Sequence, residues 1–357
     1  MKIFSIPLLI LFVVILSTSQ AWGQDVHYSQ TDFSPLNLNP ALAGGINDLS
    51  VNVNYKTQWQ SIATPYQTIA ASVSSIVNPN SQKKKVKLAV GIDFFNDWAG
   101  DAKLMTNSIR IHFATHLKMA EEHHLGLGLY GGLGMRNLDP NRGSWESQYN
   151  GFEYDPSLPS GEDFSGQMGG RGANAFDVGS GLFYRYASSE SRMRQNDKKE
   201  VNVGVAAYHL NQPKYGFLAG SDEKLYMRFS AFFNGSFGIA NSKISIDPAI
   251  YYHRQGPANE LLLGTYFKYT FVEYSKITNF VDEVTGSVGV FYRNFDALVV
   301  AFRFDWKGLG VGLSYDFNLF NSLIKTSKSR GGVEAVLRYV IPEYDRRGYL
   351  KGGRLLN

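Results

Sequence analysis

Histidine pairs are the first residues in this chain whose spacing could support chemistry. His112 and His116 lie four residues apart, a spacing that places two ligands side by side on a helix. The residues around them alternate as in a strand, where the same spacing separates the side chains by roughly 13 Å. His123 and His124 stand beside two glutamates in a turn-like stretch, where solvated side chains are expected. We therefore predict no metal site at either pair.

A serine, an aspartate and a histidine also fall on one face of a single expected strand, which raises the possibility of a hydrolase. Ser245 and Asp247 are separated by roughly 7 Å along such a strand, too far for a proton relay, and His253 lies further on. The glycine-rich stretch 126–134 lacks the Lys-Ser/Thr and the following helix of a phosphate-binding loop. With no cysteine in the chain, thiol chemistry is excluded. The sequence predicts no catalytic residue and no cofactor.

The elements that carry these residues show strict alternation of apolar and polar side chains. Val51, Val53 and Tyr55 alternate with Asn52 and Asn54, and the same pattern recurs as far as residue 341. Side chains of a strand point alternately to opposite faces, so every segment has one apolar and one polar surface. The fold class predicted is all-β, a transmembrane antiparallel β-barrel of the outer membrane with about 14 strands. The strands are expected near 49–57, 66–77, 86–96, 104–116, 124–136, 174–186, 200–210, 224–237, 243–254, 259–271, 285–295, 298–306, 308–318 and 332–341.

The beginning of the chain has the features of a secretory signal peptide over residues 1–23. Lys2 precedes an apolar run, and Ala21-Trp22-Gly23 fits a small-x-small cleavage site. That run is too short for a membrane-spanning helix, which needs roughly 20 apolar residues. The net charge of +4 is small and dispersed, so it does not indicate nucleic-acid binding. Outer-membrane lipid of a Gram-negative cell is the expected surrounding.

Aromatic residues gather at the ends of the expected strands. We interpret Trp59, Trp98, Trp306 and the Tyr251-Tyr252 pair as girdles at the membrane–water interface. The alternative is the ordinary aromatic core of a soluble β-sandwich. Pro248 interrupts the ninth strand and indicates a bulge, a kink or a misplaced strand.

The polar faces of the strands carry charges of both signs, which would line the lumen of a barrel. Pairing across a narrow lumen is the expected role, and a field that guides a polar solute or holds a plug is the alternative. The basic residues are Arg110, Arg185, Arg228, Lys268, Arg293, Arg303 and Arg338. The acidic residues are Asp93, Asp177, Asp247, Asp305, Asp316 and Glu334.

The segment before the first strand, residues 24–48, has neither period and is too apolar for a free tail. We expect it to be a periplasmic segment that packs into or against the mouth of the barrel, as a possible plug. Residues 49–341 would form the barrel, residues 137–172 a long extracellular loop, and residues 342–357 a periplasmic tail. The motif residues of the segment are Phe33, Pro35, Asn37, Asn39, Pro40, Ala41 and Gly44.

The motif HYSQTDFSPLNLNPALAG at 27–44, followed by VNYKTQW at 53–59, resembles the start of the PorP/SprF family of the type IX secretion system of Bacteroidetes. Further similar blocks follow in order: FFNDWAGD at 94–101, VNVGVAAYHLNQP at 201–213, SIDPAIYYHRQGPANELLLGTYFKY at 245–269, GVGLSYDFN at 310–318 and SRGGVEAVLRYVI at 329–341.

This resemblance implies a non-enzymatic accessory of type IX secretion in the outer membrane. Its implied partners are an exported surface protein with a C-terminal targeting domain, such as a gliding adhesin, together with the translocon barrel and the periplasmic machinery. A channel for uptake of small solutes is the alternative, and an outer-membrane lipid hydrolase is a distant third.

Overall fold

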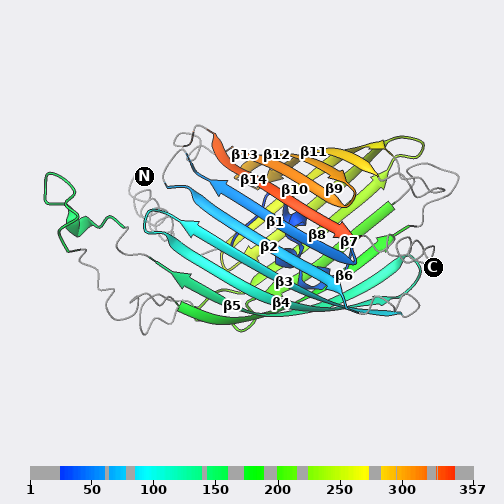
Figure 1. Ribbon diagram of the computed structural model, residues 1–357, viewed down its shortest axis with the longest axis horizontal. Helices are drawn as coiled ribbons and strands as arrows, with labels where there is room; N and C mark the ends of the chain where they lie inside the picture. Colours follow the sequence, from blue (N-terminus) through cyan, green and yellow to red (C-terminus); the bar gives the residue numbers. More distant parts are fainter. Residues whose placement is uncertain are drawn as a thin grey trace, which may run out of the picture.

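A computed structural model describes most of the chain after the predicted signal peptide. The described residues are 25–60, 64–77, 85–138, 143–159, 173–188, 199–214, 224–272, 283–294, 296–319, 327 and 329–341. The predicted signal peptide, the predicted tail and part of the predicted long loop lie outside them. Within the described residues, fourteen antiparallel strands form one closed barrel, which confirms the predicted fold class (Figure 1).

Each strand pairs with its neighbours in the sequence, and the first strand pairs with the last. The strands are β1 Leu49–Gln58, β2 Tyr66–Ile76, β3 Val86–Ala99, β4 Leu104–Lys118, β5 His123–Asn137, β6 Ala173–Ala187, β7 Lys199–Tyr208, β8 Arg228–Gly238, β9 Ile244–Gln255, β10 Ala258–Val272, β11 Val284–Arg293, β12 Ala297–Trp306, β13 Leu309–Asn318 and β14 Arg330–Ile341. Four short helical turns complete the described structure: η1 Thr31–Phe33, α2 Pro35–Leu38, η2 Pro40–Leu42 and η5 Glu146–Gln148.

The alternation in the sequence becomes an apolar outer face and a polar inner face. Val53 and Tyr55 of β1 are each 41% exposed on the outside, whereas the alternating residues Asn52 and Asn54 are buried in the lumen. The outward side chains of the other strands are likewise mostly large and apolar. This is the partition that hydrocarbon on the outside requires. No described helix is long and apolar enough to cross a membrane.

Three details of the strands differ from the expectation or refine it. Tyr252 points outward as predicted, but Tyr251 is buried on the lumen side, because neighbouring residues of a strand face opposite ways. Pro248 lies within β9, and the β8–β9 register is interrupted between Ala249 and Ile246. Strand β8 begins at Arg228, four residues later than predicted.

The two ends of the barrel are named by the direction of β1, which runs from the near end to the far end. The near end contains Leu49, where β1 begins, and Ile341, where β14 ends; the far end contains Gln58 and Arg330. The main-chain amide of Asp48 donates to Ile341 at 3.1 Å, so the chain enters the sheet at the near end.

Candidate functional site: the lumen and its N-terminal segment

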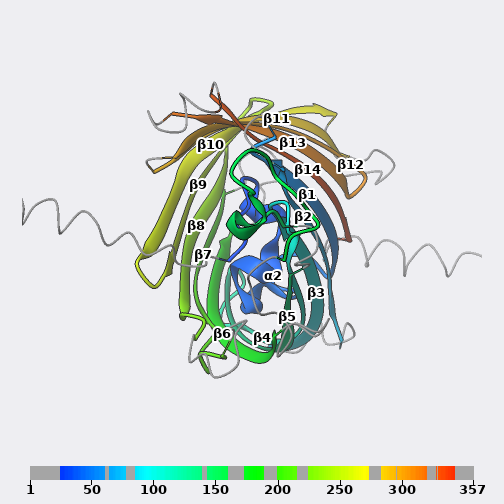
Figure 2. The ribbon, with the colours of Figure 1, turned by 90° about the vertical axis from the view of Figure 1, so that its left-hand side faces the viewer.

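Residues 25–48, called the lumen segment below, lie inside the barrel. Figure 2, a view from the left-hand side of Figure 1, shows this segment in blue within the ring of strands. Asp25 contacts residues at the far end, whereas Asp48 bonds to the strands at the near end. Phe33, Leu36 and Leu38 are each 1% exposed or less. The segment therefore runs along the barrel rather than resting only against one mouth.

At the far end, Asp25 is held by a cluster of charged side chains. Its carboxylate lies 2.8 Å from His209 Nε2 and 3.3 Å from Arg228, and the other ring nitrogen of His209 lies 2.9 Å from Asp177. Burial opposes ionisation of Asp25, but His209 and Arg228 lower the pKa of its carboxyl group far below the usual range. Burial lowers the pKa of His209, but Asp25 and Asp177 outweigh burial and raise that pKa to about 9. The four groups form a neutral, mutually paired cluster.

In the middle of the lumen, the segment is bound to the wall through the side chain of Asn39. The amide nitrogen of Asn39 donates to the main-chain oxygens of Leu182 at 2.8 Å and Val205 at 3.1 Å, on the paired strands β6 and β7. Its side-chain oxygen accepts from the amide of Ala41 at 2.8 Å. The nitrogen and the oxygen of this fully buried side-chain amide thus both bond to main-chain groups, as a buried polar group requires.

Glycines on the lumen face make the space for this contact. A Cβ atom on Gly128 would lie 2.2 Å from the main-chain nitrogen of Ala41, and one on Gly181 would lie 2.1 Å from the side-chain oxygen of Asn39. One on Gly91 would lie 2.8 Å from Leu36. Any larger residue at Gly128 would collide with the main chain of the segment, which cannot swing aside as a side-chain tip can.

Arginines of β4 and β8 bind the same segment through Asn37. Arg110 pairs with Asp93 at 2.5 Å and also donates to the side-chain oxygen of Asn37 at 3.1 Å. Arg228 donates to the main-chain oxygen of Asn37 at 2.9 Å. His112 bonds to Asp93 as well, so the histidine is a partner of this ion pair.

On the opposite wall, residues of β12 and β14 bind the segment through ion pairs, hydrogen bonds and cation–π contacts. Asp32 is bonded by both terminal nitrogens of Arg303. The ring of Phe33 lies between two guanidinium groups, 4.7 Å from Arg303 and 4.6 Å from Arg338. Glu334 accepts from the main-chain amides of Ser29 and Gln30, the former at 2.6 Å.

All thirteen charged residues that the sequence analysis assigned to the polar faces, seven basic and six acidic, point into the lumen or its mouths. Further ion pairs of these residues are Arg185 with Glu200 at 3.1 Å, Lys268 with Asp247 at 3.5 Å, Arg293 with Asp316 at 2.8 Å and with Asp296 at 3.2 Å, and Arg338 with Asp305 at 2.9 Å.

Sequence reasoning missed several residues that bind the segment. Lys56 donates to the main-chain oxygen of His27 at 3.1 Å, and His116 bonds to that of Ala43 at 2.7 Å. Both belong to the polar face that the alternation already defined, so that signal could have found them. Tyr208 donates to Leu36 at 2.9 Å from the last position of β7. No periodic signal marks His209, which follows the end of its strand.

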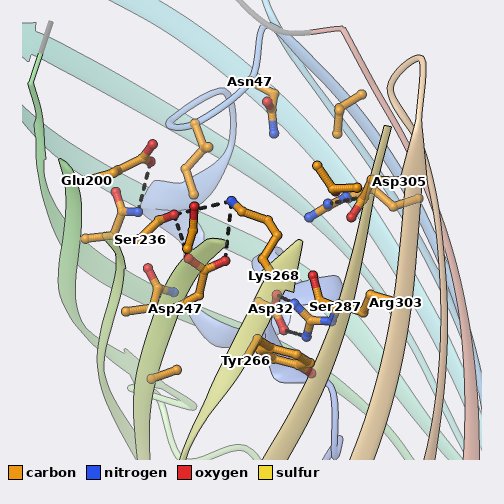
Figure 3. A pocket seen from close by; sticks show the side chains of 18 of the residues that line it. Asp32, Asn47, Glu200, Ser236, Asp247, Tyr266, Lys268, Ser287, Arg303 and Asp305 are labelled. Carbon is orange, nitrogen blue, oxygen red and sulfur yellow. Dashed lines mark hydrogen bonds and ion pairs between the residues drawn. The ribbon is translucent and has the colours of Figure 1, made fainter. Parts of the chain in front are cut away.

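A polar cavity of about 540 Å³ lies between the lumen segment and the near end. Figure 3 shows Lys268 extending toward Asp247 and Ser236 on one side and Asp32 against Arg303 below. Ser236 donates to Asp247 at 2.6 Å. Asp247 is thus engaged by Ser236 and Lys268 rather than by a serine–histidine relay. Among the described residues, no group of three or more potential ligands is arranged to hold a metal.

A closed antiparallel barrel with an apolar exterior and a polar, occupied lumen defines the class of outer-membrane β-barrel proteins. Residues 21–339 match the model of the family described as "Type IX secretion system membrane protein PorP/SprF". The chain belongs to this family. It is therefore a membrane component of type IX secretion in the outer membrane.

Solved structures with a similar fold are distant in sequence. The Ralstonia pickettii toluene transporter TbuX is 10% identical over 86% of this chain and 92% of that chain, with a TM-score of 0.46. The P. putida toluene transporter TodX is 12% identical over 85% and 92%, with a TM-score of 0.43. A deltaS2S3 mutant of the TodX monoaromatic hydrocarbon channel is 10% identical over 85% and 93%, with a TM-score of 0.48. No curated protein matches this chain.

Proposed function

We propose that this barrel supports the export or the cell-surface anchoring of a cargo protein that carries a C-terminal targeting domain, such as a gliding adhesin. The near end would face the periplasm and the far end the exterior, and the translocon barrel and periplasmic machinery would be its other partners. Residues 1–23 would be removed as a signal peptide. Family membership supports the secretion role.

The lumen segment would act as a resident plug. The observation that carries this proposal is the burial of most of residues 28–43 inside the barrel, with Asn39 bonded to one wall and Asp32 to the other. A barrel filled in this way is better suited to holding a protein partner than to passing a solute. The lumen charges would serve to fix the plug.

The test combines a deletion strain with conductance measurements. Without the protein, we expect proteins with a C-terminal targeting domain to be lost from the cell surface, and expression of the intact chain should restore them. The intact barrel should conduct little in planar bilayers, whereas a barrel lacking residues 27–44 should conduct steadily if it still folds. Heat-modifiable migration on gels reports whether it does.

The cavity at the near end favours the alternative of a solute channel. Steady conductance of the intact barrel, loss of solute uptake in the deletion strain and unchanged surface proteins would together support the channel and contradict the secretion proposal.

A further inference from the structure

Between β5 and β6, residues 143–159 form a small ordered unit at the far end, called the aromatic hairpin below. It stands away from the left-hand end of the barrel in Figure 1. Tyr149 and Tyr154 form an antiparallel bridge, and the amide of Asp155 donates to the main-chain oxygen of Gln148 at 2.8 Å. Asn150 closes the tip by accepting from the amides of residues 152 and 153 at 2.9 and 3.0 Å.

The side chain of Gln148 is the centre of this unit. Only 8% exposed, its amide donates to the main-chain oxygen of Leu158 at 3.0 Å. Its oxygen accepts from the amide of Trp145 and from the hydroxyl of Tyr154, both at 3.2 Å. The conformation is therefore fixed by hydrogen bonds around Gln148, to which Tyr154 contributes only its hydroxyl group.

Three aromatic rings are presented to the outside by this frame. Phe152 at the tip is 94% exposed, Tyr149 is 58% exposed and Tyr154 is 46% exposed. Large aromatic side chains held in a preformed conformation provide most of the affinity in many protein interfaces, because little entropy is lost on binding. At 94% exposure, the ring of Phe152 buries almost no surface within the hairpin.

The charge of the hairpin indicates the chemistry of its partner. Glu146, Glu153 and Asp155 are its charged residues, and residues 143–159 contain no lysine or arginine. An anionic lipid surface would repel these carboxylates. A protein surface with an apolar groove and a rim of lysine and arginine would accept both the rings and the charges.

We propose that the aromatic hairpin docks, with Phe152 as its anchor, into a basic-rimmed apolar groove of a partner protein outside the barrel. This site goes beyond the secretion role, since it assigns a binding surface that neither the lumen segment nor the ion pairs of the lumen involve.

Photo-crosslinking in whole cells tests the proposal. A benzophenone amino acid replaces Phe152, and in a control chain it replaces Ser157, an exposed position of the same hairpin. We expect a protein adduct from position 152, with crosslinked peptides rich in lysine or arginine, and a far weaker one from position 157. Glu146→Lys together with Glu153→Lys, or added salt, should reduce the adduct about tenfold, the change that 1.4 kcal/mol of binding free energy produces.

Tyr149→Ala in the position-152 chain should also lower the yield, while heat-modifiable migration of the barrel stays unchanged. The proposal is overturned by the absence of an adduct, by equal adducts from positions 152 and 157, by an adduct with lipid alone, or by a yield that charge reversal and salt do not alter. The deletion strain tests the secretion role by the display of cargo on the cell surface. A negative crosslinking result would therefore overturn the docking site without contradicting the secretion role.

Discussion

Asp32 and Arg303, 271 residues apart in the chain, form a two-pronged ion pair inside the barrel. The guanidinium group also lies 3.6 Å from the ring centre of Tyr266 and 4.7 Å from that of Phe33. The pair joins the lumen segment to β12 and so helps to fix the position of the segment along the barrel axis. Removing either side chain of this ion pair should therefore lower the free energy of unfolding.

Asp32→Ala should lower the free energy of unfolding by about 3 kcal/mol, because Arg303 is left as a buried charge without its partner. Combining it with Arg303→Met should cost less than the sum of the two single changes. Urea titration of the barrel in lipid bilayers measures the three variants. Strict additivity would mean that the two side chains are not energetically coupled.

Gly128→Ala should destabilise the barrel by about 1–3 kcal/mol, since the new methyl group meets the main chain of the lumen segment at Ala41. Gly131→Ala is the matched control. It lies on the same strand but faces outward, where the nearest atom, of Phe176, would be 3.6 Å away. The control should change the free energy of unfolding by less than about 0.5 kcal/mol. Equal effects at both positions would contradict the close fit.

Asn39→Asp should be more harmful than Asn39→Ala at neutral pH. The aspartate removes the donor and places a buried negative charge against the main-chain oxygens of Leu182 and Val205. We expect a loss of about 1–3 kcal/mol for alanine and a larger loss for aspartate. Lowering the pH should narrow the difference, because a protonated carboxyl group can donate again. Protease digestion of the lumen segment provides a second readout.

The cluster around His209 predicts a loss of stability in alkali. The folded-state pKa of His209, about 9, lies above its unfolded value near 6.5. Its contribution is therefore complete below pH 6.5 and is lost as the pH rises through 9. Asp25, Asp177 and Arg228 face the ring, and Tyr130 donates to Asp177 at 2.8 Å.

His209→Gln should accordingly be less stable than the parent chain at pH 6 and nearly equal to it at pH 10. Unfolding titrations at several pH values measure the difference. A difference that stays constant from pH 6 to pH 10 would show that the imidazolium is not the stabilising species.

The strands could be predicted because alternation is a local property of the sequence. Val53 and Tyr55 follow directly from their neighbours, and the turns between β11, β12 and β13 were expected within a few residues. The same rule shows why the interpretation of Tyr251 was wrong while Tyr252 faces outward: adjacent residues of a strand cannot share a face. The PorP/SprF motifs gave the family for the same reason, since each is a continuous stretch.

The contacts inside the lumen could not be predicted in this way. Asp25 and Asp32 belong to a segment without periodicity, and their partners His209 and Arg303 lie 184 and 271 residues away. Gly128 stands in the glycine-rich stretch 126–134, but the sequence does not say which atoms of the lumen segment lie beside it. Only the closed sheet brings Asn39 to the oxygens of β6 and β7.

The pairing of β1 with β14 has a consequence for the order of assembly. The chain leaves the lumen at Asp48 and continues at once into β1, whose ten residues pair with β14, the last of the described strands. Since main chain from Asn39 to Ala41 is pressed into recesses of the wall, it fits there most easily while the sheet is still an open, curved surface. Closure of the seam then traps it. We therefore expect that, during biogenesis, the sheet curls around its own beginning.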